Sequence, residues 1–232
     1  MKDLQYQMIP LSFNDAVKNY EKRKYYTKNM MHFINLDSSS SFGNLQLIFI
    51  GILQDIEQSN KRIYESHYLY VMAKNGNDQS VDIGDHLKPV EESIYWMKRA
   101  IDRLIALHWL IDYNKRVGKY PAKIKVDSIG ELLRLEKSTH EAKKSFYDMY
   151  EEWLTFLNFM NRSSNAYKHS VLTDENPSLQ VGQKEPLVIS LGMFNNDSSN
   201  NKSYQHDSLD NVTVQFTTFY RGIREILEKL SS

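Results

Sequence analysis

The 232-residue chain contains no cysteine, and it has only 5 prolines and 9 glycines. The absence of cysteine excludes disulfide frameworks, cysteine-ligated zinc and thiol nucleophiles, and it fits a reducing compartment. A chain of this length buries enough apolar surface to fold without a disulfide or a metal. We therefore expect a fold that rests on an ordinary hydrophobic core.

Net charge and long apolar segments are also missing. Basic and acidic residues balance at 29 each, so contact with RNA requires a local patch. The most apolar run, residues 45–53, is interrupted by Gln46 and is far shorter than the roughly 20 residues that cross a bilayer. The opening sequence MKDLQYQMIP lacks the pattern of a secretory signal. We expect a cytoplasmic protein with no membrane contact.

Standard catalytic motifs are absent as well. The chain has no GxxxxGK[ST], GxGxxG, GxSxG or HExxH sequence. Glu65 with His67, and Asp82 with His86, lack metal-ligand spacing, so we predict no metal and no cofactor. Four aromatic residues at helical positions are interpreted as packing residues rather than as a platform for stacking bases: Tyr95, Trp96, Trp109 and Trp153.

What the sequence does contain is helical periodicity. Apolar residues recur at intervals of three, four and seven residues, which predicts amphipathic helices. We place these helices at residues 13–36, 44–73, 90–117, 138–171 and 211–230. A shorter helix at 128–135 is capped by Ser128, and Gly118 ends the third long helix.

The composition of the sequence changes after residue 173. The sequence PLVISLGMF is β-prone, and the polar residues 195–208 that follow are predicted to form a mobile tip.

The predicted fold class is mainly α, an up-and-down helical bundle with a small β excursion before the C-terminal helix. We expect one domain over residues 1–232, with a helical core of about 12–172, an insertion of about 177–208 and a closing helix of about 211–230.

One segment, NRSSNAYKHS at residues 161–170, carries an unusual set of polar groups. A helix turns about 100° per residue, so Arg162, Asn165 and His169 fall at about 0°, 300° and 340°. This stripe of a guanidinium, an amide and an imidazole adjoins an apolar helix face that ends at Met160. Polar groups that point toward a core need partners, either structural or catalytic.

The three side chains suit phosphodiester chemistry without a metal. Histidine titrates near neutral pH, so His169 can move the proton of a ribose 2′-hydroxyl or of a leaving oxygen. Arg162 can grip phosphate oxygens and stabilise charge on phosphorus. Asn165 can orient the imidazole or the sugar, and Lys168 lies alongside and adds positive charge.

An arginine followed, after four to six intervening residues, by a histidine late in a helical bundle resembles the HEPN superfamily, and NAYKHS resembles its terminal signature. The resemblance implies a helical bundle that acts as a metal-independent endoribonuclease, with its site where two protomers meet. Such proteins commonly serve as toxins or in defence against phage. Carried over, Arg162 binds phosphate, His169 is the acid or base, and Ser163 and Lys168 contact the substrate.

The same pattern occurs at four places, which are Arg62–His67, Arg103–His108, Arg134–His140 and Arg162–His169. On a continuous helix the first three spacings leave the two side chains about 120–140° apart, whereas the last brings them to about 20°. The family favours Asn, Asp or His directly after the arginine. Ile63, Leu104 and Leu135 stand there in the first three pairs, and Ser163 in the last.

Our leading hypothesis is therefore a homodimeric, HEPN-type endoribonuclease that binds RNA, with a toxin or phage-defence role and an antitoxin as a further partner. A catalytically silent helical module that binds a partner protein or nucleotide is the alternative, and a purely structural role is a third. In both of these Arg162 and His169 merely pair with carbonyls or carboxylates.

Overall fold

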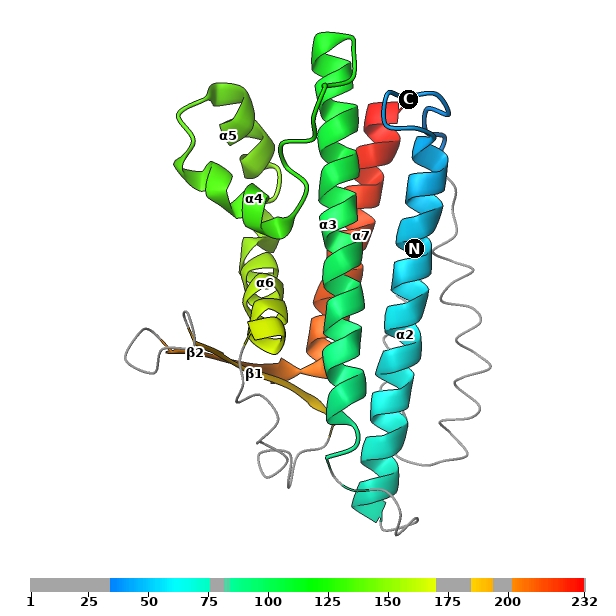
Figure 1. Cartoon of the computed structure of the whole chain (residues 1–232), viewed down its shortest axis with the longest axis vertical. Helices are drawn as coiled ribbons and strands as arrows, with labels where there is room; N and C mark the ends of the chain where they lie inside the picture. The colour runs from blue at the N-terminus through cyan, green and yellow to red at the C-terminus, as the bar shows by residue number, and fades with distance from the viewer. Residues whose placement is uncertain (1–33, 76–81, 83, 170–184, 194–201, 232) are drawn as a thin grey trace.

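Figure 1 shows a mainly helical molecule with a two-stranded sheet before its last helix. The computed structural model describes residues 34–75, 82, 84–169, 185–193 and 202–231. The predicted fold class is confirmed. The helices are α2 (Leu45–Asn75), α3 (Leu87–Val117), α4 (Ile129–Arg134), α5 (Glu141–Asp148), α6 (Leu154–His169) and α7 (Leu209–Ser231), and the strands are β1 (Leu187–Met193) and β2 (Lys202–Ser208).

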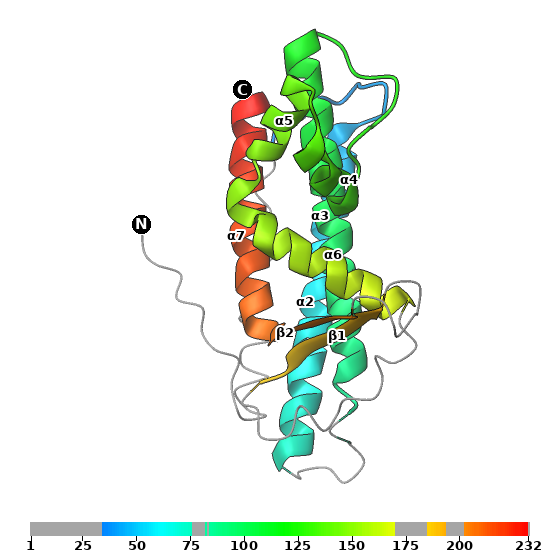
Figure 2. The same cartoon turned by 90° about the vertical axis from the view of Figure 1, so that its left-hand side faces the viewer.

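The long helices alternate in direction along the chain. α2 and α3 lie side by side and antiparallel, α7 packs behind them against α3, and α6 lies on the other flank of α3 (Figure 1). Figure 2 shows that α6 is inclined to α3 and that its C-terminal end reaches the sheet. These four helices therefore form the predicted up-and-down bundle.

Local signals set several helix ends where the sequence predicts them. The Asn44 side chain accepts the Gln46 backbone N–H at 2.9 Å and caps α2. The Ser128 hydroxyl accepts the Glu131 N–H at 3.3 Å and caps α4. Gly118 ends α3 with a φ of 75°, a conformation that glycine adopts without strain.

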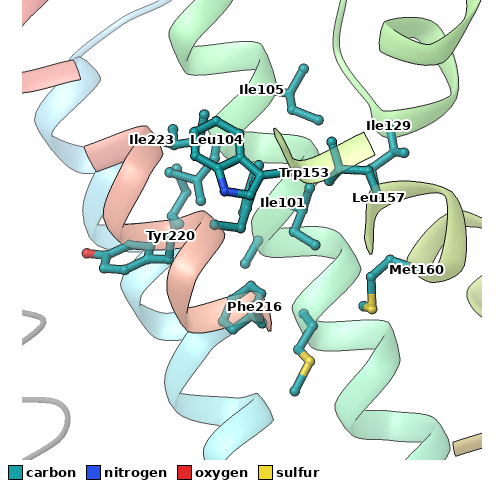
Figure 3. Close-up of a cluster of buried hydrophobic side chains, with 14 of the residues drawn as sticks. Ile101, Leu104, Ile105, Ile129, Trp153, Leu157, Met160, Phe216, Tyr220 and Ile223 are labelled. Carbon is teal, nitrogen blue, oxygen red and sulfur yellow. The ribbon is translucent and has the colours of Figure 1, made fainter. Parts of the chain in front are cut away.

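Trp153 packs between α3 and α7 in the core (Figure 3). Figure 3 shows its indole among apolar side chains that include Leu104 and Ile223, both fully buried. A Cβ added to Gly222 of α7 would lie only 2.3 Å from Cζ2 of Trp153. The absence of a side chain at residue 222 therefore lets the indole pack directly on the backbone of α7.

The most apolar run, residues 45–53, forms the first turns of α2. Leu45, Phe49 and Ile52 in this run are fully buried, whereas Leu47 is 64 % exposed. Within the described ranges, no helix is both long enough and apolar enough to cross a membrane.

The predicted continuous helix over residues 138–171 is wrong. α5 ends at Asp148, and a short 3-10 turn at Glu151–Trp153 precedes α6. Tyr150, with φ −104° and ψ 5°, leaves the helical conformation and buries its ring completely. Its hydroxyl lies 2.7 Å from Nδ1 of His108, so a contact with α3 interrupts the helix. Met149, expected on the apolar face, is 37 % exposed.

The predicted first helix, residues 13–36, lies mostly outside the described residues. Its last three residues, 34–36, are not helical. Ile34 and Leu36 are nevertheless buried, and the Ile34 carbonyl accepts a hydrogen bond from Nε2 of Gln46 at 2.6 Å. This segment therefore packs against the start of α2 as extended chain.

The polar tip predicted at residues 195–208 is wrong over its second half. Lys202–Ser208 form strand β2, which pairs antiparallel with β1 from Leu187↔Ser208 to Met193↔Lys202. Polar β2 owes its order to backbone pairing with β1, whose Val188 and Ser190 are buried. Residues 195–201 of the predicted tip lie outside the described residues.

Candidate functional site

Helix α6 carries the Arg162, Asn165 and His169 stripe. The helix is unbroken from Leu154 to His169, so the spacing of seven residues brings Arg162 and His169 to within about 20° of each other around its axis. Arg162 and Asn165 are exposed. Within the described part of the chain, neither side chain has a hydrogen bond or an ion pair. The His169 side chain lies outside the described residues.

The opposite side of the same helix is fixed to β1. Ser163 is fully buried, and its hydroxyl accepts a hydrogen bond from that of Ser190 at 3.2 Å. The Tyr167 hydroxyl donates to the Ile189 carbonyl at 3.0 Å, and burial raises its pKa. These contacts hold α6 in one rotation with Arg162 facing solvent. Ser163, which the sequence suggests as a substrate contact, lies on the side that faces β1.

The Arg62–His67 pair is engaged elsewhere. Arg62 bonds Glu65 at 2.5 Å and Glu92 at 2.7 Å. His67 is 5 % exposed, and its Nε2 lies 3.0 Å from Oδ1 of Asp210 in α7. This distance suits an ion pair, although the two atoms are not aligned for a hydrogen bond. His67 therefore serves the contact between α2 and α7.

The two residues of the Arg103–His108 pair are engaged in separate contacts. Arg103 bonds the buried Asp55 of α2 at 2.8 Å. His108 is fully buried beside Tyr150, and burial lowers its pKa to about 4. An imidazole with so low a pKa stays neutral at pH 7, so it cannot serve as a general acid there.

The Arg134–His140 pair does not share a helix. Arg134 is the last residue of α4 and bonds Glu131 in the same helix. His140 directly precedes α5 and is exposed. Of the four pairs, only Arg162–His169 therefore combines one continuous helix with an arginine that has no ion pair among the described residues.

Two aromatic residues of α3 are not the packing residues that the sequence suggests. Tyr95 is 43 % exposed and Trp96 is half-buried, whereas Trp109 and Trp153 are buried. The helical period could have shown this from the sequence. Residues 95 and 96 lie about 100° and 200° around the helix axis from Ile94, which belongs to the buried stripe. Lys168 of the predicted site is exposed, with its Nζ 5.8 Å from the Tyr95 ring centroid.

Acidic groups gather where α7 begins. Burial, together with a hydrogen bond to Asp210, raises the pKa of Glu185, and the charge of Asp207 contributes. Across the portion of the chain that the structure describes, no three metal-binding side chains come together in a way that could hold a metal ion.

No protein-family model matches the chain, and neither does any curated protein or solved structure.

Proposed function

We propose that this protein is a metal-independent endoribonuclease of the HEPN type, with Arg162 and His169 as its catalytic pair. The observation that carries the proposal is the exposed guanidinium of Arg162, which has no ion pair among the described residues and lies on an unbroken helix that also contains His169. Asn165 lies between them on the same stripe, and Lys168 adds a second exposed cation. The other arginine–histidine pairs differ from this one. Arg62 and Arg103 form ion pairs, and His108 is buried in the core. Arg134 and His140 do not share a helix.

In the proposed reaction, the 2′-oxygen of a ribose attacks the adjacent phosphorus and the bond to the 5′-oxygen breaks, leaving a 2′,3′-cyclic phosphate. Arg162 binds the phosphate oxygens and stabilises the charge that develops on them. His169 moves one proton, either from the 2′-hydroxyl or to the leaving 5′-oxygen. Asn165 orients the imidazole or the sugar.

One histidine performs only half of this acid–base work. We propose that a second protomer supplies the other half in a homodimer, because a two-fold axis places the same stripe on both sides of the interface. The proposed biological role is that of a toxin or a phage-defence nuclease, which implies toxicity on expression and an antitoxin as a partner.

The test is incubation of the purified full-length chain with total RNA in EDTA. We expect cleavage by the wild type, and its loss by about 100-fold or more in Arg162→Ala and His169→Ala, the scale of a lost acid–base group. Melting temperature and helicity should hardly change, because groups used for chemistry rather than for packing contribute little to stability.

Arg134→Ala and His140→Ala are the matched controls, since both residues are exposed and belong to another of the four arginine–histidine pairs. They should cleave like the wild type. Unchanged cleavage in His169→Ala, or unfolding of that variant, would remove the catalytic assignment. A chain that binds RNA or a protein without cleaving RNA would instead be the interaction module.

A further inference from the structure

Tyr95 and Trp96 form an aromatic pair on the outer side of α3. Their rings meet edge to face, with centroids 5.2 Å apart and an interplanar angle of 76°. Among the described helices, α2 and α6 flank α3 and α7 lies behind it (Figure 1). Tyr95 is 43 % exposed, although burying an aromatic ring of this size is favourable.

A cation lies over each of the two rings. Cζ of Arg99 is 5.2 Å from the Trp96 ring centroid, and Nζ of Lys168 is 5.8 Å from that of Tyr95. Both distances are within the range of cation–π attraction. We call Tyr95, Trp96, Arg99 and Lys168 the aromatic–cationic surface. It joins α3 to α6.

The charges around this surface leave it positive. Arg99 and Arg103 share a single carboxylate, that of the buried Asp55, at 3.5 and 2.8 Å. One positive charge of that trio is therefore unbalanced. Lys168 is exposed and has no ion pair among the described residues.

Acidic residues on the same stretch of α3 reduce this positive charge but do not reverse it. Glu91 lies one turn before Tyr95 and close enough to Tyr167 of α6 to help raise its pKa, so it offsets one of the two positive charges left by the trio and Lys168. Glu92 bonds Arg62 at 2.7 Å, and Asp102 bonds Lys98 and accepts the backbone N–H of Ile129 at 2.9 Å.

The surface continues into the Arg162 stripe. Lys168 lies about 9 Å along the helix axis from Arg162 and about 120° from it around the axis. Asn165 of the stripe lies between them, about 60° from each, so the surface meets the stripe at Asn165. Exposed apolar side chains would favour a protein partner, but among the described residues of α3 none extends the surface. The nearest on α3 is Val117, about 32 Å away along the helix from Trp96.

We propose that the aromatic–cationic surface binds single-stranded RNA and leads it to Arg162. Unpaired bases stack on Tyr95 and Trp96, and Arg99 and Lys168 neutralise phosphates beside them, as in other proteins that hold single strands by aromatic stacking in a positive groove. Base-paired RNA buries its bases and cannot stack in this way. The inference rests on the proposed action on RNA.

Tryptophan fluorescence of the full-length His169→Ala variant provides the first test, because that variant should leave the RNA intact. Of the three tryptophans, Trp109 and Trp153 are 4 % and 7 % exposed, so a stacked base should quench only Trp96. We expect a single-stranded oligoribonucleotide of about twelve nucleotides to quench the emission at moderate salt. The same sequence as a duplex should quench little. Equal quenching by both, or none by either, would overturn the proposal.

Substitutions provide the second test, with fluorescence anisotropy of the labelled oligoribonucleotide as the measurement. Tyr95→Ala and Trp96→Ala, each in the His169→Ala background, should weaken binding about tenfold, the typical loss for one stacked base. Tyr204→Ala is the matched control, because Tyr204 is 49 % exposed and lies on β2 against His206. It should bind like its parent. Equal affinity in all three variants would contradict the proposal.

The outcomes separate this inference from the proposed nuclease. Oligoribonucleotide binding that depends on Tyr95 and Trp96, without cleavage by the wild type, supports the proposed RNA-binding surface and contradicts the proposed nuclease activity. Cleavage that depends on His169 but is unaffected by Tyr95→Ala and Trp96→Ala supports the proposed nuclease activity and contradicts the proposed RNA-binding surface.

Discussion

His108 is a titratable residue that the fold uses in its neutral form. It lies on the buried stripe of α3, where the periodicity of the sequence predicts it. Nδ1 of His108 and the Tyr150 hydroxyl lie 2.7 Å apart and share a hydrogen bond, whose direction is set by the tautomer of the neutral ring. Burial raises the pKa of the Tyr150 hydroxyl well above its usual value, so the hydroxyl stays protonated. Nε2 of His108 has no hydrogen-bond partner among the described residues.

We predict that the protein loses stability as the pH falls from about 6.5 toward about 4 because of His108. The unfolded histidine takes up a proton near pH 6.5, whereas the folded one does so only near pH 4, so acid favours the unfolded chain between these values. The gap corresponds to about 3 kcal/mol of unfolding free energy. Urea unfolding at several pH values measures it.

His108→Gln is the control for this pH dependence, because an amide can accept the Tyr150 hydroxyl but does not titrate. The difference in stability between wild type and variant should shrink as the pH falls below about 6.5. A difference that stays constant from pH 7 to pH 4 would show that His108 does not carry the effect.

Single positions in the candidate site were predictable to different degrees. The exposure of Arg162 and Asn165 follows the helical period, because Met160 of the buried face lies about 160° from Arg162 around the axis, so the expectation that this stripe points toward the core is wrong. The burial of Ser163 does not, because it depends on Ser190, which lies 27 residues later on β1. A small polar side chain such as serine does not indicate which face of its helix a strand will cover.

At the scale of elements, α7 packs closely on Trp153 at Gly222, and we predict that Gly222→Ala destabilises the protein. Alanine favours a helix over glycine by about 1 kcal/mol. The added Cβ would lie 2.3 Å from Trp153, however, and overpacking a core typically costs about 1–3 kcal/mol. We expect a net loss of stability and a lower melting temperature in thermal unfolding followed by circular dichroism.

Gly130→Ala in α4 is the matched control, because nothing lies within 4 Å of a Cβ added there. It should leave stability unchanged or raise it by up to about 1 kcal/mol. Equal stabilisation by both substitutions would mean that the indole moves aside without cost.

Element boundaries were predictable wherever their cause is local. Gly118 and Ser128 act on their own helix ends, and both were found from the sequence. The break at Tyr150 and strand β2 were missed, because each depends on a partner distant in sequence. The spacing of apolar residues describes one element at a time. Contacts between α3 and α5, or between β1 and β2, therefore cannot be predicted from it.

At the scale of the whole molecule, we predict a homodimer whose Arg162 stripes face each other. The absence of cysteine makes this directly testable, because one introduced thiol has only its copy in the partner to pair with. Asn165→Cys, on the exposed stripe, should form an intermolecular disulfide under mild oxidation. Sedimentation should show a dimer at about 10 μM protein, well above the dissociation constant of a stable interface.

Glu152→Cys is the control, since residue 152 is exposed but lies before α6, away from the stripe. It should crosslink poorly. A strictly monomeric sedimentation profile, or equal crosslinking at both positions, would contradict the facing arrangement.

The packing of Trp153 on α7 also has a kinetic consequence. α2 and α3 are neighbours in sequence, so their pairing closes a short loop and should form early. Phe219, 5.6 Å from Trp153, belongs to a helix that follows α3 by on the order of 100 residues, and contacts between such distant segments slow folding. We therefore expect docking of α7 to limit the refolding rate. Until it docks, the ring of Trp153 is open to aggregation with other chains.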